Sequence, residues 1–319
     1  FRNLFFIVIL LSFLVNYLFL KPKYPIPDLN GIVIVTGASS GIGRSTTFDL
    51  ARKGFVVFAG FRKEEDGIAL AIDAESENIT SIVPIQLDVT NEKHIQACYD
   101  SVLMYMRKFD KKFSGLVNNA GVSMRSTMEG TDVEKMKFVF DVNVFGLMRM
   151  TSKFAYLLRE NHARVVNIGS LAGIFSRPLN GVYSASKFAV EALSDATRLE
   201  MKHLGVSVSL VQPGAVQSAI IEKHIGKSNP LNQISNEEKQ TYSKFWNGIG
   251  TDEHRRKSFA KAPFPESTTN PAIQHALTSS YPLPRYPVAG FAGLPGWLIV
   301  QLKCLPDRWS DYIMLNILS

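Results

Sequence analysis

The chain has 319 residues, of which 46% are hydrophobic and 20% are charged, with a formal net charge of +7. This length and apolar content fit one large α/β domain with an additional segment. Its two cysteines and six histidines lack metal-ligand spacing and its basic residues are dispersed, so a disulfide framework, a metal site and nucleic-acid binding are not expected.

The chain begins with a hydrophobic run, Leu4–Leu20, that only three residues interrupt. As a helix it would be roughly 26 Å long, enough to cross the hydrocarbon core of a bilayer. A cleaved signal peptide is the alternative, but the run is long for one and no small-residue cleavage site precedes Lys21. We therefore predict a membrane anchor at 1–21, spanning or partly embedded, and a stiff proline-rich linker at 22–30.

Strand-like and helix-like segments alternate from residue 31 onward, which implies parallel βαβ units in a doubly wound α/β sheet. The predicted strands are Ile32–Val35, Val56–Ala59, Ile82–Gln86, Gly115–Val117, Arg164–Ile168 and Val206–Val211. The longest helical patterns cover Val133–Leu158 and Val182–His203. We assign residues 31–290 to this one domain.

The first strand runs into a glycine-rich turn, Thr36-Gly-Ala-Ser-Ser-Gly-Ile-Gly43. The first glycine permits a tight turn, the second lets the backbone approach a pyrophosphate, and the third lets the following helix pack closely. A P-loop would need Gly in place of Ala38 and Lys in place of Arg44, so nucleotide hydrolysis is disfavoured. A glycine-rich turn alone is also compatible with a loop that binds nothing.

The second strand is followed by residues that bear on which dinucleotide would bind. Sites that prefer NAD usually place Asp or Glu there, whereas Arg accommodates the additional phosphate of NADP. This chain has Phe61 and Arg62 in those places. We therefore predict NADP(H), with NAD(H) as the alternative, and a solvated charge is the other interpretation of Arg62.

Three residues, Ser170, Tyr183 and Lys187, have the spacing of a proton-transfer site. Tyr183 and Lys187 share one helix face, and Ser170 follows a strand. A phenol has a pKa of about 10, but an ammonium about 4 Å away can lower it by nearly three units before lysine desolvation is deducted. We expect Tyr183 to act as general acid in reduction and general base in oxidation. Ser170 would then bind the substrate oxygen, and Lys187 the nicotinamide ribose.

These motifs, in register with Asn118-Asn-Ala-Gly121, resemble those of the short-chain dehydrogenase/reductase family over residues 31–287. The segments Arg164–Ser170, Val190–Asp195 and Ala276–Ser279 are similar to the membrane-attached retinol and hydroxysteroid dehydrogenases and to 3-hydroxybutyrate dehydrogenase. The resemblance implies a Rossmann-type fold, a nicotinamide cofactor and an alcohol or carbonyl substrate.

The resemblance also implies roles for individual residues. Asn143 would complete the catalytic set by relaying protons through water to Lys187, Asp88 would contact the adenine, and Ser218 would replace a more usual threonine in a cofactor-embracing turn. The implied catalytic residues are Asn143, Ser170, Tyr183 and Lys187. The implied cofactor-binding residues are Gly37, Ser39, Ser40, Gly41, Ile42, Gly43, Arg62, Asp88, Val89, Asn119, Ala120, Gly121, Tyr183, Lys187, Pro213, Gly214, Val216 and Ser218.

Two segments depart from the alternating pattern. Residues 217–265 form a substrate lid or a plain surface loop, and the apolar tail at 291–319 joins the core or rests on the bilayer. We predict an oxidoreductase for a lipophilic retinoid, steroid or other lipid, in the endoplasmic reticulum membrane or alternatively a mitochondrial membrane, with a homodimer as one option. The alternatives are a small hydroxy-acid dehydrogenase, favoured if Lys223, His224 or Lys227 points inward, and a non-catalytic NADP(H)-binding protein.

Overall fold

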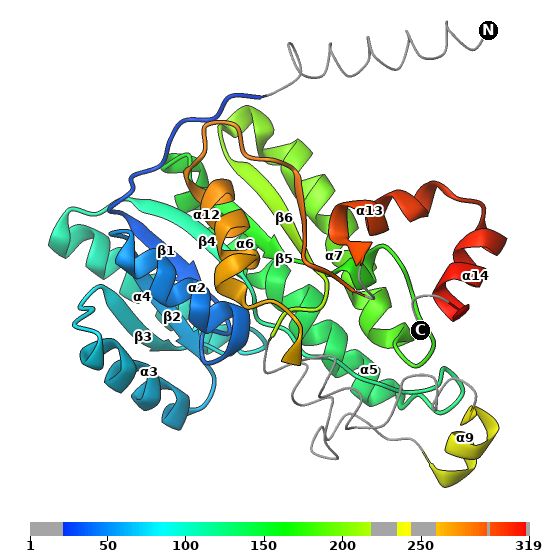
Figure 1. Ribbon diagram of the computed structural model, residues 1–319. Coiled ribbons are helices and arrows are strands. Elements are labelled where there is room, and N and C mark those ends of the chain that lie inside the picture. The colour runs from blue at the N-terminus through cyan, green and yellow to red at the C-terminus, as the bar shows by residue number, and fades with distance from the viewer. Residues whose placement is uncertain (1–21, 218–234, 244–259, 292–293, 317–319) are drawn as a thin grey trace, which may run out of the picture.

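A computed structural model of the chain describes residues 22–217, 235–243, 260–291 and 294–316 (Figure 1). The predicted anchor at 1–21 and most of the predicted lid at 217–265 lie outside the described residues. Among the residues that are described, no helix combines the length and the apolar character needed to cross a membrane.

Seven parallel strands form one sheet in the order β3-β2-β1-β4-β5-β6-β7. The strands are β1 (Ile32–Val35), β2 (Val56–Phe61), β3 (Ile82–Gln86), β4 (Phe113–Asn118), β5 (Arg164–Ile168), β6 (Ser207–Pro213) and β7 (Arg285–Val288). The direction of winding reverses between β1 and β4, and doubly wound sheets bind ligands at the carboxyl ends of the strands beside such a reversal. The doubly wound α/β fold is confirmed.

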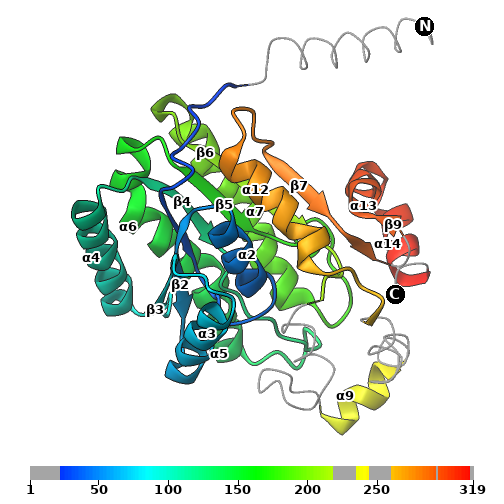
Figure 2. The same cartoon turned by 60° about the vertical axis from the view of Figure 1, so that its left-hand side comes forward.

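Helices cover both faces of the sheet, as the two views in Figures 1 and 2 show. One face carries α2 (Gly41–Arg52), α3 (Glu64–Ser76) and α12 (Thr269–Thr278), and the other carries α4 (Glu92–Phe109), α6 (Leu147–Glu160) and α7 (Gly181–Met201). In β1, Val33 and Val35 join the core beneath α2, whereas Ile32 and Ile34 join the core beneath α4 and α6. The four β-branched residues of this strand are therefore buried on alternating faces.

The long helix predicted from Val133 is interrupted. It begins as α5 (Val133–Phe140), widens into a π-helical turn at Asp141–Gly146, and continues as α6. Asn143 lies in this turn, where its side chain accepts from the backbone N–H of Val122 and donates to the carbonyl of Val122, both at 2.8 Å. The wide turn therefore fixes the helix to the loop after β4.

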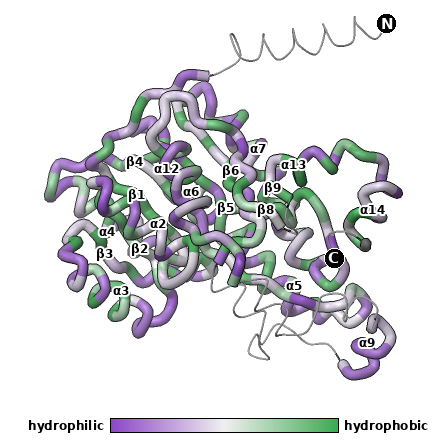
Figure 3. Tube along the Cα trace, in the orientation of Figure 1, coloured by the Kyte–Doolittle hydropathy of each residue, from purple (hydrophilic) through white to green (hydrophobic). Residues whose placement is uncertain are grey.

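The C-terminal tail contributes to the core in part. After a short hairpin, β8 (Gly290–Phe291) and β9 (Leu294–Pro295), come α13 (Gly296–Gln301) and α14 (Asp307–Asn316). Ile299 of α13 is fully buried in a cluster with Leu171 and Ile174, whereas Trp297 is 62% exposed. Figure 3 shows that hydrophobic residues mark the strands, while the short peripheral helix α9 (Asn236–Thr241) is hydrophilic.

Candidate active site

The glycine-rich turn after β1 and the loop after β4 form one hydrogen-bonded unit. The Thr36 hydroxyl accepts from the backbone N–H groups of Asn119 and Ala120, both at 2.9 Å. The Asn119 amide in turn donates to the carbonyl oxygens of Thr36 at 2.8 Å and Gly37 at 3.0 Å. The predicted residues on these two neighbouring strands are therefore brought together by direct contacts.

Two positions of the turn, Gly37 and Gly43, have room for glycine only. The turn also leaves the start of α2 without a side-chain cap. Gly37 has a φ of +65°, and a Cβ on Gly43 would lie 2.3 Å from both the Asn119 amide nitrogen and the Gly37 carbonyl oxygen. Ser40 precedes α2 but makes no side-chain capping hydrogen bond, and the first turn of α2 holds no acidic residue. Backbone N–H groups and the positive end of a helix dipole suit a pyrophosphate, so these residues fit a dinucleotide.

The predicted adenosine end of the site lies at the carboxyl ends of β2 and β3. The Phe61 ring packs on α3, since a Cβ on Gly67 would meet that ring at 2.4 Å. Arg62 is exposed beside it. The Asp88 carboxylate accepts from the backbone N–H of Thr90 at 2.9 Å and from its hydroxyl at 2.7 Å. Phe61 is therefore a packing residue, and Arg62 is accessible to an additional phosphate.

The three proton-transfer candidates converge at the end of β5. The Ser170 hydroxyl is close enough to the Tyr183 phenol to oppose the rise that burial causes in its pKa. Lys187 is buried, and its ammonium group donates to the carbonyl of Ile168 at 2.8 Å and lies 5.8 Å from the centre of the Tyr183 ring. A strand end and one helix face thus bring together the hydroxymethyl group, the phenol and the amine that the sequence pattern singled out.

The electrostatics of this group differ from the sequence-based expectation. Burial raises the pKa of Tyr183, and the nearby Ser170 hydroxyl acts in the opposite direction. Burial lowers the pKa of Lys187 to about 8. The expected lowering of the tyrosine pKa was wrong for this chain, because burial of the phenol raises its pKa more than Ser170 lowers it. Near neutral pH the phenol is therefore protonated and able to donate.

Asn143 lies beside this group. Its amide donates to the Ser186 hydroxyl at 3.0 Å, and that hydroxyl donates to the carbonyl of Tyr183 at 2.7 Å. A Cβ on Gly121 would lie 3.4 Å from the side-chain oxygen of Asn143 and 3.9 Å from the ammonium nitrogen of Lys187. Gly121 therefore lies close to both Asn143 and Lys187. The relay of protons through water stays a prediction.

The turn after β6 closes another side of the site. The Ser170 hydroxyl lies 3.4 Å from the carbonyl oxygen of Pro213, to which it donates. The backbone N–H of Gly214 donates to the carbonyl of Val288 at 2.9 Å, and Val216 is buried. Ser218, the last of the predicted cofactor-binding residues, lies outside the described residues.

Comparison with known proteins assigns this site to a family. The family model of short chain dehydrogenases matches residues 31–228. The chain belongs to the short-chain dehydrogenase/reductase family. The predicted family is thereby confirmed, and this dehydrogenase is an oxidoreductase that acts on CH–OH groups.

Individual relatives cover most of the chain. The mitochondrial D-beta-hydroxybutyrate dehydrogenase of Rattus norvegicus is 35% identical over 301 residues, which cover 89% of this chain and 83% of that protein. The 17-beta-hydroxysteroid dehydrogenase type 6 of Rattus norvegicus is 30% identical over 299 residues, covering 88% and 87%. A short-chain dehydrogenase/reductase from Burkholderia phymatum, solved in complex with NAD, has a TM-score of 0.64 at 23% identity, covering 78% of this chain and 87% of its own. That likeness supports the fold.

Sequence reasoning did not single out a buried polar layer that underlies the site of this dehydrogenase. The Asn118 amide donates to the Thr151 hydroxyl at 3.1 Å and to the Asn167 carbonyl oxygen at 2.9 Å. The Asn167 amide donates to the Ser194 hydroxyl at 2.9 Å. These bonds join β4 and β5 to α6 and α7. Their signal in the sequence was an asparagine in each of two buried strands, Asn118 at the end of β4 and Asn167 within β5.

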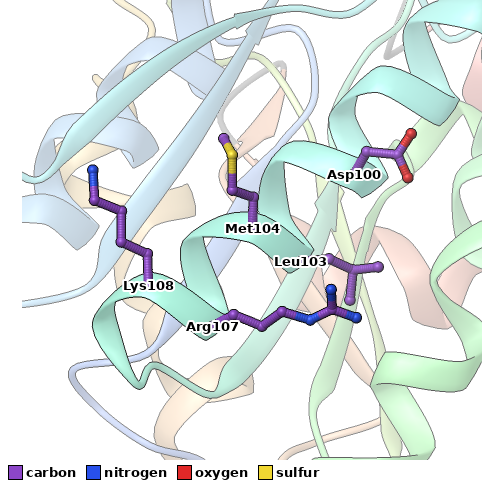
Figure 4. Close-up of a pocket in the computed structure, with 5 residues that line it drawn as sticks. All are labelled: Asp100, Leu103, Met104, Arg107 and Lys108. Atoms are coloured by element: carbon purple, nitrogen blue, oxygen red, sulfur yellow. The ribbon is translucent and has the colours of Figure 1, made fainter.

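A surface depression elsewhere in the dehydrogenase carries no candidate chemistry. Figure 4 shows its lining side chains, and all of them come from the single helix α4. They are Asp100, Leu103, Met104, Arg107 and Lys108. Because no strand end contributes to this depression, we do not assign it to the reaction.

Proposed function

We propose that this dehydrogenase interconverts an alcohol and a carbonyl on a lipophilic substrate, such as a retinoid, a steroid or another lipid, with NADP(H) as the favoured cofactor and NAD(H) as the alternative. The observation that carries the proposal is the convergence of Ser170 and Tyr183 beside the buried amine of Lys187, which lies 5.8 Å from the centre of the Tyr183 ring. We propose that the hydroxyl groups of Ser170 and Tyr183 bind the substrate oxygen that reacts.

The residues divide the work of holding the cofactor. The glycine-rich turn and the start of α2 hold the pyrophosphate, Arg62 pairs with the 2′-phosphate, and Lys187 binds the nicotinamide ribose. When bound, the nicotinamide supplies or accepts the hydride. NAD(H) stays the alternative because the Burkholderia phymatum relative is described in complex with NAD.

The protein side of the reaction is a proton transfer at one hydroxyl group. In reduction, Tyr183 donates its proton to the carbonyl oxygen while the Ser170 hydroxyl holds that oxygen in place. In oxidation, Tyr183 takes the proton of the alcohol. The raised pKa of Tyr183 keeps the phenol protonated near neutral pH, which is the form that donates in reduction.

The name of one relative supports a lipophilic substrate, and the segment after Ser170 is apolar. The chain leaves Ser170 directly into an apolar cluster of Leu171, Ile174 and Ile299, with Phe175 packed against it. The hydroxysteroid dehydrogenase among the relatives has a lipid substrate by name. Membrane attachment and a homodimer are further parts of the proposal.

A small hydroxy acid is the second candidate substrate. It is favoured by the D-beta-hydroxybutyrate dehydrogenase among the relatives, whose name also supports the mitochondrial alternative over the endoplasmic reticulum. The cationic residues that would favour this candidate, Lys223, His224 and Lys227, lie outside the described residues. The preserved proton-transfer group argues against cofactor binding without turnover.

A substrate screen with both cofactors tests the proposal. Purified protein is given retinoids, steroids and short hydroxy acids with NADP(H) or NAD(H), and nicotinamide absorbance is followed. We expect turnover of a lipid alcohol or carbonyl, and Tyr183→Phe should abolish it while cofactor affinity stays nearly unchanged. Turnover by Tyr183→Phe at the wild-type rate would refute the assigned mechanism, and activity on hydroxy acids alone would favour the second candidate.

A further inference from the structure

The helix α9 is docked on the turn that connects β4 to α5. The Thr127 hydroxyl donates to one carboxylate oxygen of Glu238, and the Tyr242 hydroxyl donates to Glu129 at 2.5 Å. A Cβ on Gly130 would lie 1.9 Å from that same oxygen of Glu238. The carboxylate is therefore seated directly against the turn, in space that a larger residue at position 130 would occupy.

Glu238 also organises its own helix. Its second carboxylate oxygen accepts from the backbone N–H of Ser235 at 2.9 Å, while its backbone N–H donates to the Ser235 hydroxyl at 3.1 Å. This is a capping box, which fixes the first turn of a helix. Glu238 is half-buried, whereas its neighbour Glu237 is exposed. One side chain thus joins the start of α9 to the turn beneath it.

The same turn adjoins the start of α7, the helix that carries the reacting tyrosine. The backbone N–H of Ser126 donates to the carbonyl of Leu179 at 3.2 Å, in the segment that leads into α7. A Cβ on Gly181 would lie 2.5 Å from the sulfur of Met128, and Gly181 is two residues before Tyr183. The turn at 126–130 is therefore a wall beside the start of α7, and α9 lies against that wall near α5 (Figure 1).

We propose that Glu238 is a positioning residue for substrate binding, which it supports by holding α9 against the turn at 126–130 beside Tyr183. This inference rests on the function proposed above. Glu238 touches neither Ser170 nor Lys187 in the described contacts, so it acts through the shape of the wall and leaves the proton transfer itself unchanged.

Variants at both ends of the contact test the inference. Glu238→Ala and Thr127→Val should each raise the substrate KM about fivefold, as expected for loss of one charge-assisted hydrogen bond at a partly exposed site, with kcat within about twofold. Thr127→Ser keeps the hydroxyl and should restore the wild-type KM. Glu237→Gln removes a charge from the same helix without touching the turn, and it should change nothing.

The cofactor KM and amide hydrogen exchange separate this inference from the proposed function. In Glu238→Ala the cofactor KM should stay at the wild-type value, and exchange at residues 235–243 should become faster. A wild-type enzyme that turns over, with an unchanged substrate KM in both Glu238→Ala and Thr127→Val, would overturn the inference and leave the function intact. Unchanged exchange at 235–243 would overturn the docking whatever the activity.

Discussion

Lys187 makes the stability of this dehydrogenase depend on pH in a calculable way. Burial lowers its pKa from the ordinary 10.5 to about 8 in the folded chain. Below about pH 8 both folded and unfolded chains carry the proton, so the folded state bears the full penalty. Between the two pKa values the unfolded chain keeps the proton that the folded chain has released, so stability rises with pH.

The size of the effect follows from the two pKa values. At about 1.4 kcal/mol for each pKa unit, protonated Lys187 costs the folded state about 3 kcal/mol at pH 7. Most of the relief comes between about pH 8 and pH 10, and raising the pH from about 7 to 9.5 should recover about 2 kcal/mol. Lys187→Met keeps an apolar stem but has no amine, so it should lack this gain.

Urea unfolding of the cofactor-free protein at about pH 7 and about pH 9.5 measures the gain. The comparison uses only the change with pH, because Lys187→Met also loses the bond to the Ile168 carbonyl at 2.8 Å and shifts stability at every pH. Lys53→Met, which removes an exposed lysine, is the matched control and should keep the wild-type dependence. Parallel pH dependences for wild type and Lys187→Met would refute the assignment of the shift to this amine.

Two further predictions concern the scaffold. Arg164 is fully buried and donates to the Ser207 hydroxyl at 2.9 Å and to the carbonyls of Pro25 at 2.6 Å and Ser279 at 3.0 Å. Arg164→Met should therefore lower the free energy of unfolding by about 3 kcal/mol in urea titrations, and a loss below about 1 kcal/mol would contradict it. Gly43→Ala should raise the cofactor KM at least about tenfold, because its Cβ would lie 2.3 Å from the Asn119 amide nitrogen. Fluorescence titration with the cofactor measures the affinity, and an unchanged affinity would contradict the prediction.

The strands were predictable wherever burial on both faces leaves an apolar run. All six predicted strands are present, and β1, β3 and β5 have the predicted bounds. The edge strand β7 was missed because Pro287 lies within it and Pro284 precedes it. Proline removes a backbone donor, which an edge strand tolerates on its unpaired side, so local sequence gives little strand signal there.

The position of the candidate site was also predictable, but its charge balance was not. Spacing alone places Tyr183 and Lys187 on one helix face, whereas the partner of the lysine depends on which carbonyl the fold presents. That partner is Ile168, 19 residues earlier in the chain. The π-helical turn at Asn143 escaped prediction for the same reason, since its partner Val122 is 21 residues away. Contacts between distant residues decide both features.

The two sides of the site differ in how closely the backbone determines them. The cofactor side is built from strand ends and glycines, and Gly37 and Gly43 lie directly against Asn119. A short sequence motif is therefore sufficient to predict this side of the site. We infer that the substrate side includes the turn at 126–130, which Glu238 joins to α9, and the segment after β5, against which Ile299 of α13 packs. Each of these contacts can change without disturbing the sheet. Relatives at 30 to 35% identity with different named substrates are therefore compatible with one proton-transfer group, and substrate choice has to be sought in these outer contacts.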